Sequence, residues 1–247
     1  MMNEKEILQW YIDAGVDVIC GDVPLLQTVA EEKKEPPVVA DVAQMGMVAC
    51  KNARQICEKA NSLEELAKAV EIFDGCTLKH TANKTVFGDG DEHARVLFVG
   101  EAPGADEDRL GKPFVGKSGM FLEKMLKSIG LERKKCYITN LLMWRPPGNR
   151  TPTSAEVAVC LPFLKRKIEL INPEVVVALG APAANALTDS EDAISKIRGK
   201  WMEYELSVGK KIDLLATFHP AYLLRNPAYK AKTWADLLKL KKKLSNK

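Results

Sequence analysis

From about residue 95 onward, short apolar runs alternate with longer stretches in which apolar residues recur at helical spacing. The runs are rich in β-branched residues, a pattern typical of parallel strands that are covered on both faces. We predict strands at 96–99, 136–139, 175–179 and 212–217, and helices near 118–129, 154–171, 182–198 and 228–244. This order predicts an α/β fold with three layers, α/β/α, around a central four-stranded, mainly parallel sheet.

The first part of the chain has a different character. Residues 7–12 have a short helix-like pattern, and a charged run at 31–37 ends in two prolines, which disfavour helix in the residue before each. We interpret that run as a linker. Ser62 and Glu65 form a capping-box pattern at the start of an amphipathic helix at 61–72. We therefore predict an acidic, partly disordered extension and linker over residues 1–60 and one folded domain over residues 61–247.

Charge and composition narrow the class of protein. The net charge of +3 combines −5 over residues 1–70 (7 Lys and Arg against 12 Asp and Glu) with +8 over residues 71–247 (29 against 21), so a polyanionic partner fits the second part only. No stretch approaches the roughly 18 apolar residues of a membrane span, and the N-terminus lacks a secretory pattern. The 6 cysteines are scattered. We expect a cytoplasmic protein whose cysteines are free thiols or metal ligands.

Polar residues follow the predicted strands at their carboxyl ends. Glu101 comes just after the first strand, Asn140 follows the second, and His219 follows the fourth. These ends share one edge of a parallel sheet, where α/β folds form their binding crevice. An asparagine amide offers a donor and an acceptor to the edge of a base, and a ring such as Phe114 would stack on a planar ligand. Together these residues are the best site candidates in the sequence.

Each candidate also has an ordinary structural interpretation. The turn at 100–104 can simply connect a strand to a helix, Asn140 can cap a turn, His219 can be a satisfied structural residue and Phe114 can belong to the core. Basic, glycine-containing segments at 84–90, 116–119 and 145–150 are each ordinary surface. Three of them near one crevice favour contacts with phosphate.

Five motifs strongly resemble those of the family 4 (type 4) uracil-DNA glycosylases, in order and with matching spacing from about residue 73 to the C-terminus. They are GEAPGADED (100–108), GKPFVGKSG (111–119), ITN (138–140), RPPGNRTP (145–152) and HPAYLLR (219–225). The resemblance implies hydrolysis of the N-glycosidic bond of deoxyuridine in DNA, which leaves an abasic site. The target base must leave the stack before a pocket can hold it.

The resemblance also implies a role for each matching residue. Phe114 would stack on uracil, Asn140 would bond its O4 and N3 edge, and His219 would stabilise negative charge on O2 as the bond breaks. Leu223 or its neighbour Leu224 would enter the vacated stack. Contacts with the DNA backbone would come from Lys117, Ser118, Arg145, Arg150 and Arg225.

The group that activates the attacking water is left open by the sequence. In family 1 enzymes an aspartate occupies the second position after the first glycine of the 100–104 loop. Here that position is Ala102, as is common in family 4, and it would line the uracil site. Glu101 is the nearest carboxylate and Glu107 is the alternative. Stabilising the leaving uracilate lowers much of the barrier, so a weak base suffices.

Family 4 members typically carry a [4Fe–4S] cluster on four cysteines, and the sequence departs from that pattern. Cys76 and Cys160 match the second and fourth ligand positions, whereas Phe73 and Trp144 occupy the first and third. Two thiolates cannot hold a cluster that needs four. We therefore expect no cofactor, with recruitment of other cysteines (Cys20, Cys50, Cys57 or Cys136) as the alternative.

The expected activity is that of a monofunctional uracil-DNA glycosylase that acts as a monomer on uracil-containing DNA. We expect it in the cytoplasm, associated with the nucleoid and without a membrane partner. Two alternatives remain open: the same fold with broader specificity for deaminated bases, and a non-catalytic DNA-binding relative. The presence of Glu101, Phe114, Asn140 and His219 together argues against the second alternative.

Overall fold

The structure is a computed structural model that describes residue 5, residues 39–207 and residues 209–245. The helix-like pattern at 7–12, the charged run at 31–37 and Cys20 lie outside the described residues. Residues 40–247 form one compact unit. Within the described part of the chain, no helix combines the length and apolar character needed to cross a membrane.

A six-stranded sheet with the order β1-β3-β2-β4-β6-β5 runs through this unit. The predicted strands are all present and mutually parallel: β2 (Val96–Gly100), β3 (Tyr137–Asn140), β4 (Val175–Leu179) and β6 (Lys211–Thr217). The expected count of four strands is corrected by two antiparallel edge strands, β1 (Asp89–Gly90) and β5 (Trp201–Glu205). Strand β1 has only 2 residues, and β5 exposes most of its side chains, so neither forms an apolar run.

Helices follow most strands, as predicted. Their bounds are α2 (Val39–Lys59), α3 (Leu63–Ile72), α4 (Ala105–Leu110), α5 (Lys117–Ser128), α6 (Ser154–Ile171), α7 (Ala181–Thr188), α8 (Ile194–Ile197), α9 (Pro220–Arg225) and α10 (Lys230–Ser245). The helix predicted at 182–198 is divided into α7 and α8. The division begins at Asp189, which adopts a left-handed conformation (φ 50°) at the end of α7.

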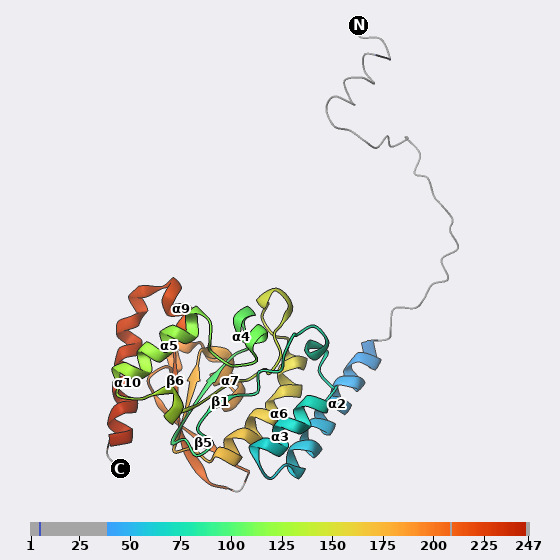
Figure 1. The fold of residues 1–247 in the computed structure, drawn as a ribbon, viewed down its shortest axis with the longest axis horizontal. Coiled ribbons are helices and arrows are strands. Elements are labelled where there is room, and N and C mark those ends of the chain that lie inside the picture. Colours follow the sequence, from blue (N-terminus) through green and yellow to red (C-terminus); the bar gives the residue numbers. More distant parts are fainter. Residues whose placement is uncertain (1–4, 6–38, 208, 246–247) are drawn as a thin grey trace, which may run out of the picture. The chain divides into compact units, whose positions relative to one another are not determined.

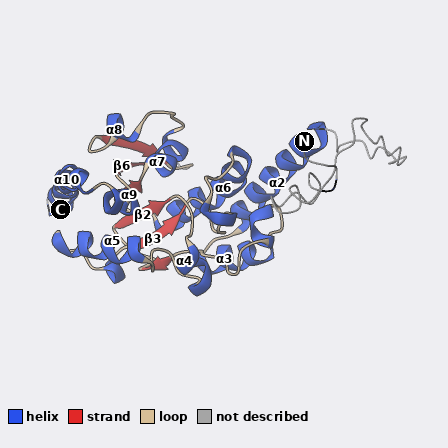
Figure 2. Ribbon diagram, turned by 90° about the horizontal axis from the view of Figure 1, so that it is seen from above, coloured by secondary structure: helices blue, strands red, loops and turns tan. Residues whose placement is uncertain are grey.

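Two buried clusters lie on opposite faces of the sheet, because successive strand residues point to opposite sides. In β2, Leu97 and Val99 belong to one cluster, and Val96 and Phe98 belong to the other. Helices α3, α6 and α7 contribute to the first cluster, and α5, α9 and α10 contribute to the second (Figure 1; Figure 2). The predicted three-layer α/β/α architecture is confirmed.

Helix α2 lies within the segment that we predicted as extension and linker. Its Ala53 and Cys57 are buried in the same cluster as α3. Arg166 of α6 donates two hydrogen bonds, of 2.8 and 3.0 Å, to the carbonyl of Ala60. At the start of α3, Ser62 Oγ accepts the predicted bond from the Glu65 amide at 3.1 Å. The division of the chain at residue 61 stays a prediction.

Candidate active site

The carboxyl ends of the parallel strands bring the predicted site residues together. Gly100 ends β2 and pairs in register with Asn140 at the end of β3. His219 follows β6 and is the N-cap residue of α9. Phe114 lies in the loop between α4 and α5, and its ring centroid is 5.5 Å from that of His219. Four segments that are distant in sequence therefore build one site.

Gly100 allows Asn140 and Phe114 to meet over the end of β2. A methyl group on Gly100 would overlap Asn140 Oδ1 and would lie 2.6 Å from Phe114 Cζ. Asn140 is only 2% exposed, and its Oδ1 has no hydrogen-bond partner among the described residues. A buried acceptor left unpaired costs about 1–3 kcal/mol. The site therefore suits a planar ligand that donates a hydrogen bond to Oδ1 while it lies against an aromatic ring.

His219 is a neutral hydrogen-bond donor. Its Nδ1 accepts a bond from the Ala221 amide at 3.2 Å, so the proton of the neutral ring is on Nε2. Burial, assisted by Arg225 and opposed by Glu107, lowers the pKa of His219 to about 4. The imidazole is uncharged near neutral pH, and Nε2–H can donate to an acceptor atom of a ligand.

The two candidate carboxylates have different environments. Glu107 Oε1 accepts bonds from the amides of Val115 and Gly116, both at 2.9 Å, and its Oε2 accepts one from the Gly104 amide at 3.1 Å. Glu107 thus connects the turn before α4 to the loop before α5. Glu101 is half-buried, and burial raises its pKa. The adjacent Ala102 packs against the cluster under α3 and α6.

The arginines of the 145–150 loop are already engaged. Arg150 forms two bonds with Glu156, at 2.6 and 2.9 Å, so most of its charge is matched within the protein. Arg145 lies 4.0 Å from the buried Asp108, which also accepts a bond from the amide of Lys84 at 3.2 Å. Asp108 therefore holds two of the basic segments next to α4, a role that the sequence reasoning missed.

Comparisons with known proteins agree with this arrangement. A model of the uracil DNA glycosylase superfamily matches residues 87–238. The chain is 44% identical to the type-4 uracil-DNA glycosylase of Thermotoga maritima over 165 residues, which cover 66% of this chain and 84% of that protein. It is 43% identical to that of Archaeoglobus fulgidus over 183 residues, covering 72% and 92%. The chain belongs to the uracil-DNA glycosylase superfamily. Within the superfamily it belongs to type 4, as the motifs predicted.

Helix α9 separates the two leucines that the family resemblance left as alternatives. Leu223 is 1% exposed and belongs to the core, whereas Leu224 is 42% exposed. Arg225, at the end of α9, is exposed as well. Lys117 and Ser118 form the first turn of α5, with Lys117 exposed and Ser118 half-buried. Of the five residues on α5 and α9, Lys117, Leu224 and Arg225 are the exposed ones; Arg150 is exposed too, but it is paired with Glu156.

Aromatic residues occupy two of the four ligand positions that the family resemblance implies for an iron–sulfur cluster. Phe73 and Trp144 stack with their centroids 6.5 Å apart, and Phe163 packs edge-on against Phe73 at 5.0 Å. Cys76 and Cys160 are buried in contact: a hydrogen bond from the Cys160 thiol lowers the pKa of Cys76 and, with burial, raises that of Cys160. Two thiols and two apolar rings do not fit a cluster that requires four thiolates.

The other described cysteines do not complete a ligand set. Cys50 and Cys57 are on α2, and Cys136 precedes β3 in the cluster on the opposite face of the sheet. Burial raises the pKa of Cys57 to about 12 and that of Cys136 to about 11, which keeps both as thiols. Within the described part of the chain, no group of three or more His, Cys, Asp or Glu side chains is placed to hold a metal ion.

Lys167 is a fully buried lysine beside the end of β3 that the sequence reasoning also missed. Its Nζ donates to the carbonyl of Phe87 at 2.6 Å and to Thr139 Oγ1 at 3.2 Å, next to Asn140. Burial lowers its pKa to about 7. A signal was present, because Lys167 is four residues after Phe163 and therefore falls on the apolar face of α6.

Proposed function

We propose that the protein hydrolyses the N-glycosidic bond of deoxyuridine in DNA, releasing free uracil and leaving an abasic site. The observation that carries the proposal is the buried, unpartnered Oδ1 of Asn140 beside the Phe114 ring, with the neutral His219 close by. Membership of the type-4 group supports it independently, since the matched relatives are named uracil-DNA glycosylases.

Asn140 selects the base. Uracil N3–H donates to Oδ1, uracil O4 accepts from Nδ2, and the pyrimidine ring stacks on Phe114. Cytosine carries no hydrogen on N3 and presents an amino group in place of O4, so both groups of the asparagine amide would be buried without a partner. A site built for hydrogen bonds rejects such an analogue strongly, because the unpaired groups cost binding energy.

His219 stabilises the leaving group. When the bond between C1′ and N1 breaks, its electron pair passes to uracil and negative charge develops on O2. The neutral Nε2–H of His219 donates to that oxygen, and Ala221 fixes the ring by donating to Nδ1. A preorganised donor of this kind contributes roughly 10²–10³ in rate.

Glu101 is the carboxylate that accepts a proton from the attacking water. The water oxygen bonds to C1′, and its proton passes to Glu101, whose carboxylate is a stronger base because burial raises its pKa. Glu107 is less suited to this role, because backbone amides already occupy both of its oxygens. Its contribution is to hold the loop that carries Phe114.

DNA binds at the carboxyl ends of the parallel strands, where the site residues lie. Leu224 is the exposed leucine of α9, so it enters the base stack once uracil has flipped out. Lys117 and Arg225 are exposed and lie at the start of α5 and the end of α9, where they contact phosphates on either side. The engaged Arg150 contributes less unless its pair with Glu156 opens.

The same proposal includes catalysis without an iron–sulfur cluster. Phe73 and Trp144 stand at two of the implied ligand positions and Phe163 packs against Phe73, so that these apolar contacts support the neighbouring loops. A monomeric state and a cytoplasmic, nucleoid-associated location are further parts of the proposal, based on the family resemblance.

Release of free uracil from defined oligonucleotides tests the proposal. Under single-turnover conditions, we expect excision of a single uracil opposite guanine or adenine and in a single strand. Oligonucleotides with hypoxanthine or xanthine in place of uracil measure the breadth of specificity, and an undamaged strand is the control. Faster release of another deaminated base would replace uracil as the substrate. Tight DNA binding without release of any base would instead indicate a non-catalytic relative.

A further inference from the structure

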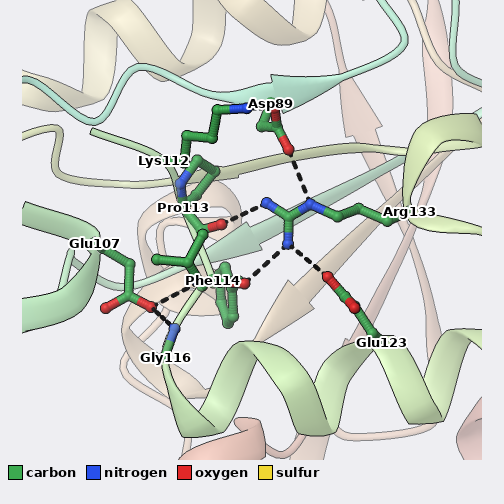
Figure 3. Close-up of polar contacts among 9 residues, drawn as sticks. Asp89, Glu107, Lys112, Pro113, Phe114, Gly116, Glu123 and Arg133 are labelled. Carbon is green, nitrogen blue, oxygen red and sulfur yellow. Dashed lines mark hydrogen bonds and ion pairs between the residues drawn. The ribbon is translucent and has the colours of Figure 1, made fainter. Parts of the chain in front are cut away.

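Arg133 connects the segment that carries Phe114 to the sheet. It begins the short 3-10 helix Arg133–Lys135, just before β3. Its Nη1 donates to the carbonyl of Phe114 at 2.8 Å and its Nη2 donates to that of Pro113 at 2.6 Å (Figure 3). On the other side, Nε donates to Asp89 at 2.8 Å and Nη1 to Glu123 at 3.3 Å. One guanidinium therefore binds two consecutive carbonyls and is itself held by two carboxylates.

The backbone at Phe114 needs such support. Its φ of 52° is in the left-handed region, which a non-glycine residue adopts only when its surroundings impose it. Gly119 of α5 permits the conformation sterically, since a Cβ there would overlap the Phe114 carbonyl. Glu107 binds the next two amides, those of Val115 and Gly116. The Pro113–Gly116 segment is thus held by a cation on its carbonyls and an anion on its amides.

We propose that Arg133 is a positioning residue for uracil recognition, because it holds Phe114 in the backbone conformation that places its ring against Gly100 and Asn140. The inference rests on the proposed function. The planar guanidinium reaches two adjacent carbonyls at once, which the single ammonium of a lysine does less well.

The test compares Arg133→Gln with the unmodified protein through inhibition by free uracil. Loss of two bonds lets the Pro113–Phe114 segment relax and moves the ring away from Asn140. Small displacements of a binding group can cost up to about 10²-fold. We expect the inhibition constant of uracil to rise about tenfold or more and the single-turnover rate to fall. Affinity for an undamaged oligonucleotide should stay within about twofold, since the hydrogen bonds of the Arg133 guanidinium go to Asp89, Glu123 and the carbonyls of Pro113 and Phe114.

Arg166→Gln is the control for loss of a partly buried arginine that binds backbone carbonyl oxygen. Arg166 also donates two bonds to a backbone carbonyl, that of Ala60, and pairs with a carboxylate, Glu169, at 2.9 Å. Its side chain is 23% exposed, against 19% for Arg133. Both variants should lower the Tm, but only Arg133→Gln should weaken uracil inhibition. Arg133→Lys should recover part of the loss, and it replaces Arg133→Gln in the comparison if that variant does not fold.

A double variant separates positioning of Phe114 from any other effect. On a Phe114→Ala background there is no ring to place, so Arg133→Gln should change the uracil inhibition constant by less than about twofold. Independent, additive losses would overturn the inference, and so would unchanged uracil inhibition in a folded Arg133→Gln. An equal loss in Arg166→Gln would also overturn it. If the unmodified protein released no uracil, the proposed function itself would fail, which is a distinct result.

Discussion

Substitution of His219 is the most direct test of how the site lowers the barrier. His219→Ala removes the Nε2–H donor, so the single-turnover rate should fall by roughly 10²–10³. Affinity for uracil-containing DNA should change little, since the bond strengthens only as charge grows on O2. His219→Gln retains a neutral N–H donor and should recover part of the rate. An unchanged rate in His219→Ala would refute the role of His219.

The pKa of His219 determines how the rate depends on pH. Because burial lowers that pKa to about 4, the ring stays neutral between pH 5.5 and 8, and the rate should show no loss as pH rises through 6.5. The rate should fall at acid pH because Glu101 must be deprotonated to accept a proton from water. Burial raises the pKa of Glu101, which moves this fall to higher pH. His219→Gln should keep this fall at acid pH. If the excision rate of the unmodified protein fell as pH rose through 6.5, and that of His219→Gln did not, the charged imidazolium would be the form of His219 that stabilises the leaving uracil.

The low pKa of His219 should also make the free energy of unfolding depend on pH. The pKa of His219 is about 4 in the folded protein and 6.5 in the unfolded chain, so the unfolded chain binds more protons between these values. The free energy of unfolding should therefore decrease as pH falls from 6.5 to 4, by up to about 3 kcal/mol from this group. Urea unfolding at pH 7 and pH 5 measures the decrease, which should be smaller in His219→Gln.

Three further outcomes follow from the site and its surroundings. Asn140→Asp places a carboxylate where uracil O4 needs a donor, so uracil release should fall and any cytosine release should rise relative to it in the oligonucleotide assay. Cys76→Ser should leave uracil release largely intact, because no cluster depends on that thiol. Phe73→Ala should lower the free energy of unfolding by roughly 3–5 kcal/mol. About four irons per chain in anaerobic preparations would contradict catalysis without a cluster. A chain starting at residue 61 should release uracil but melt at a lower temperature than one starting at residue 39, because it lacks the buried face of α2.

The sequence predicted the elements whose signal is local. The four parallel strands are buried on both faces and were visible as apolar runs, and Thr153 and Glu156 cap α6 at its predicted start. Strand β5 was missed because an edge strand that exposes alternate residues has no such run. The division between α7 and α8 depends on one left-handed residue, Asp189, for which helical periodicity gives no sign.

The residues that contact the base could be predicted from the sequence, but the residues that hold them in position could not. Strand ends placed Asn140 and His219 correctly, since parallel strands share their carboxyl edge. Arg133 acts on backbone carbonyls, which every residue has, so no pattern of side chains announces it. The choice between Leu223 and Leu224 depends on the rotation of a helix of 6 residues, too short for its periodicity to be read.

Gly100 offers a way to close the base site without disturbing the fold. It lies within β2 and is not among the glycines with positive φ, so its backbone accepts alanine. The added methyl group would overlap Asn140 Oδ1 and lie 2.6 Å from Phe114 Cζ. Asn140 is buried at the end of a strand and Phe114 is held by Arg133, so neither side chain can move aside without leaving its place in the site.

Gly100→Ala should therefore lower kcat/KM for uracil release by at least about 10²-fold, as a misplaced binding group does, while DNA affinity is retained. Gly46→Ala is the control, because Gly46 lies in α2 with no atom within 4 Å of an added Cβ. That change should be neutral for activity and stabilise the helix by about 0.5–1 kcal/mol. Full activity in Gly100→Ala would mean that uracil does not bind between Asn140 and Phe114, and the assignment of both residues would have to be abandoned.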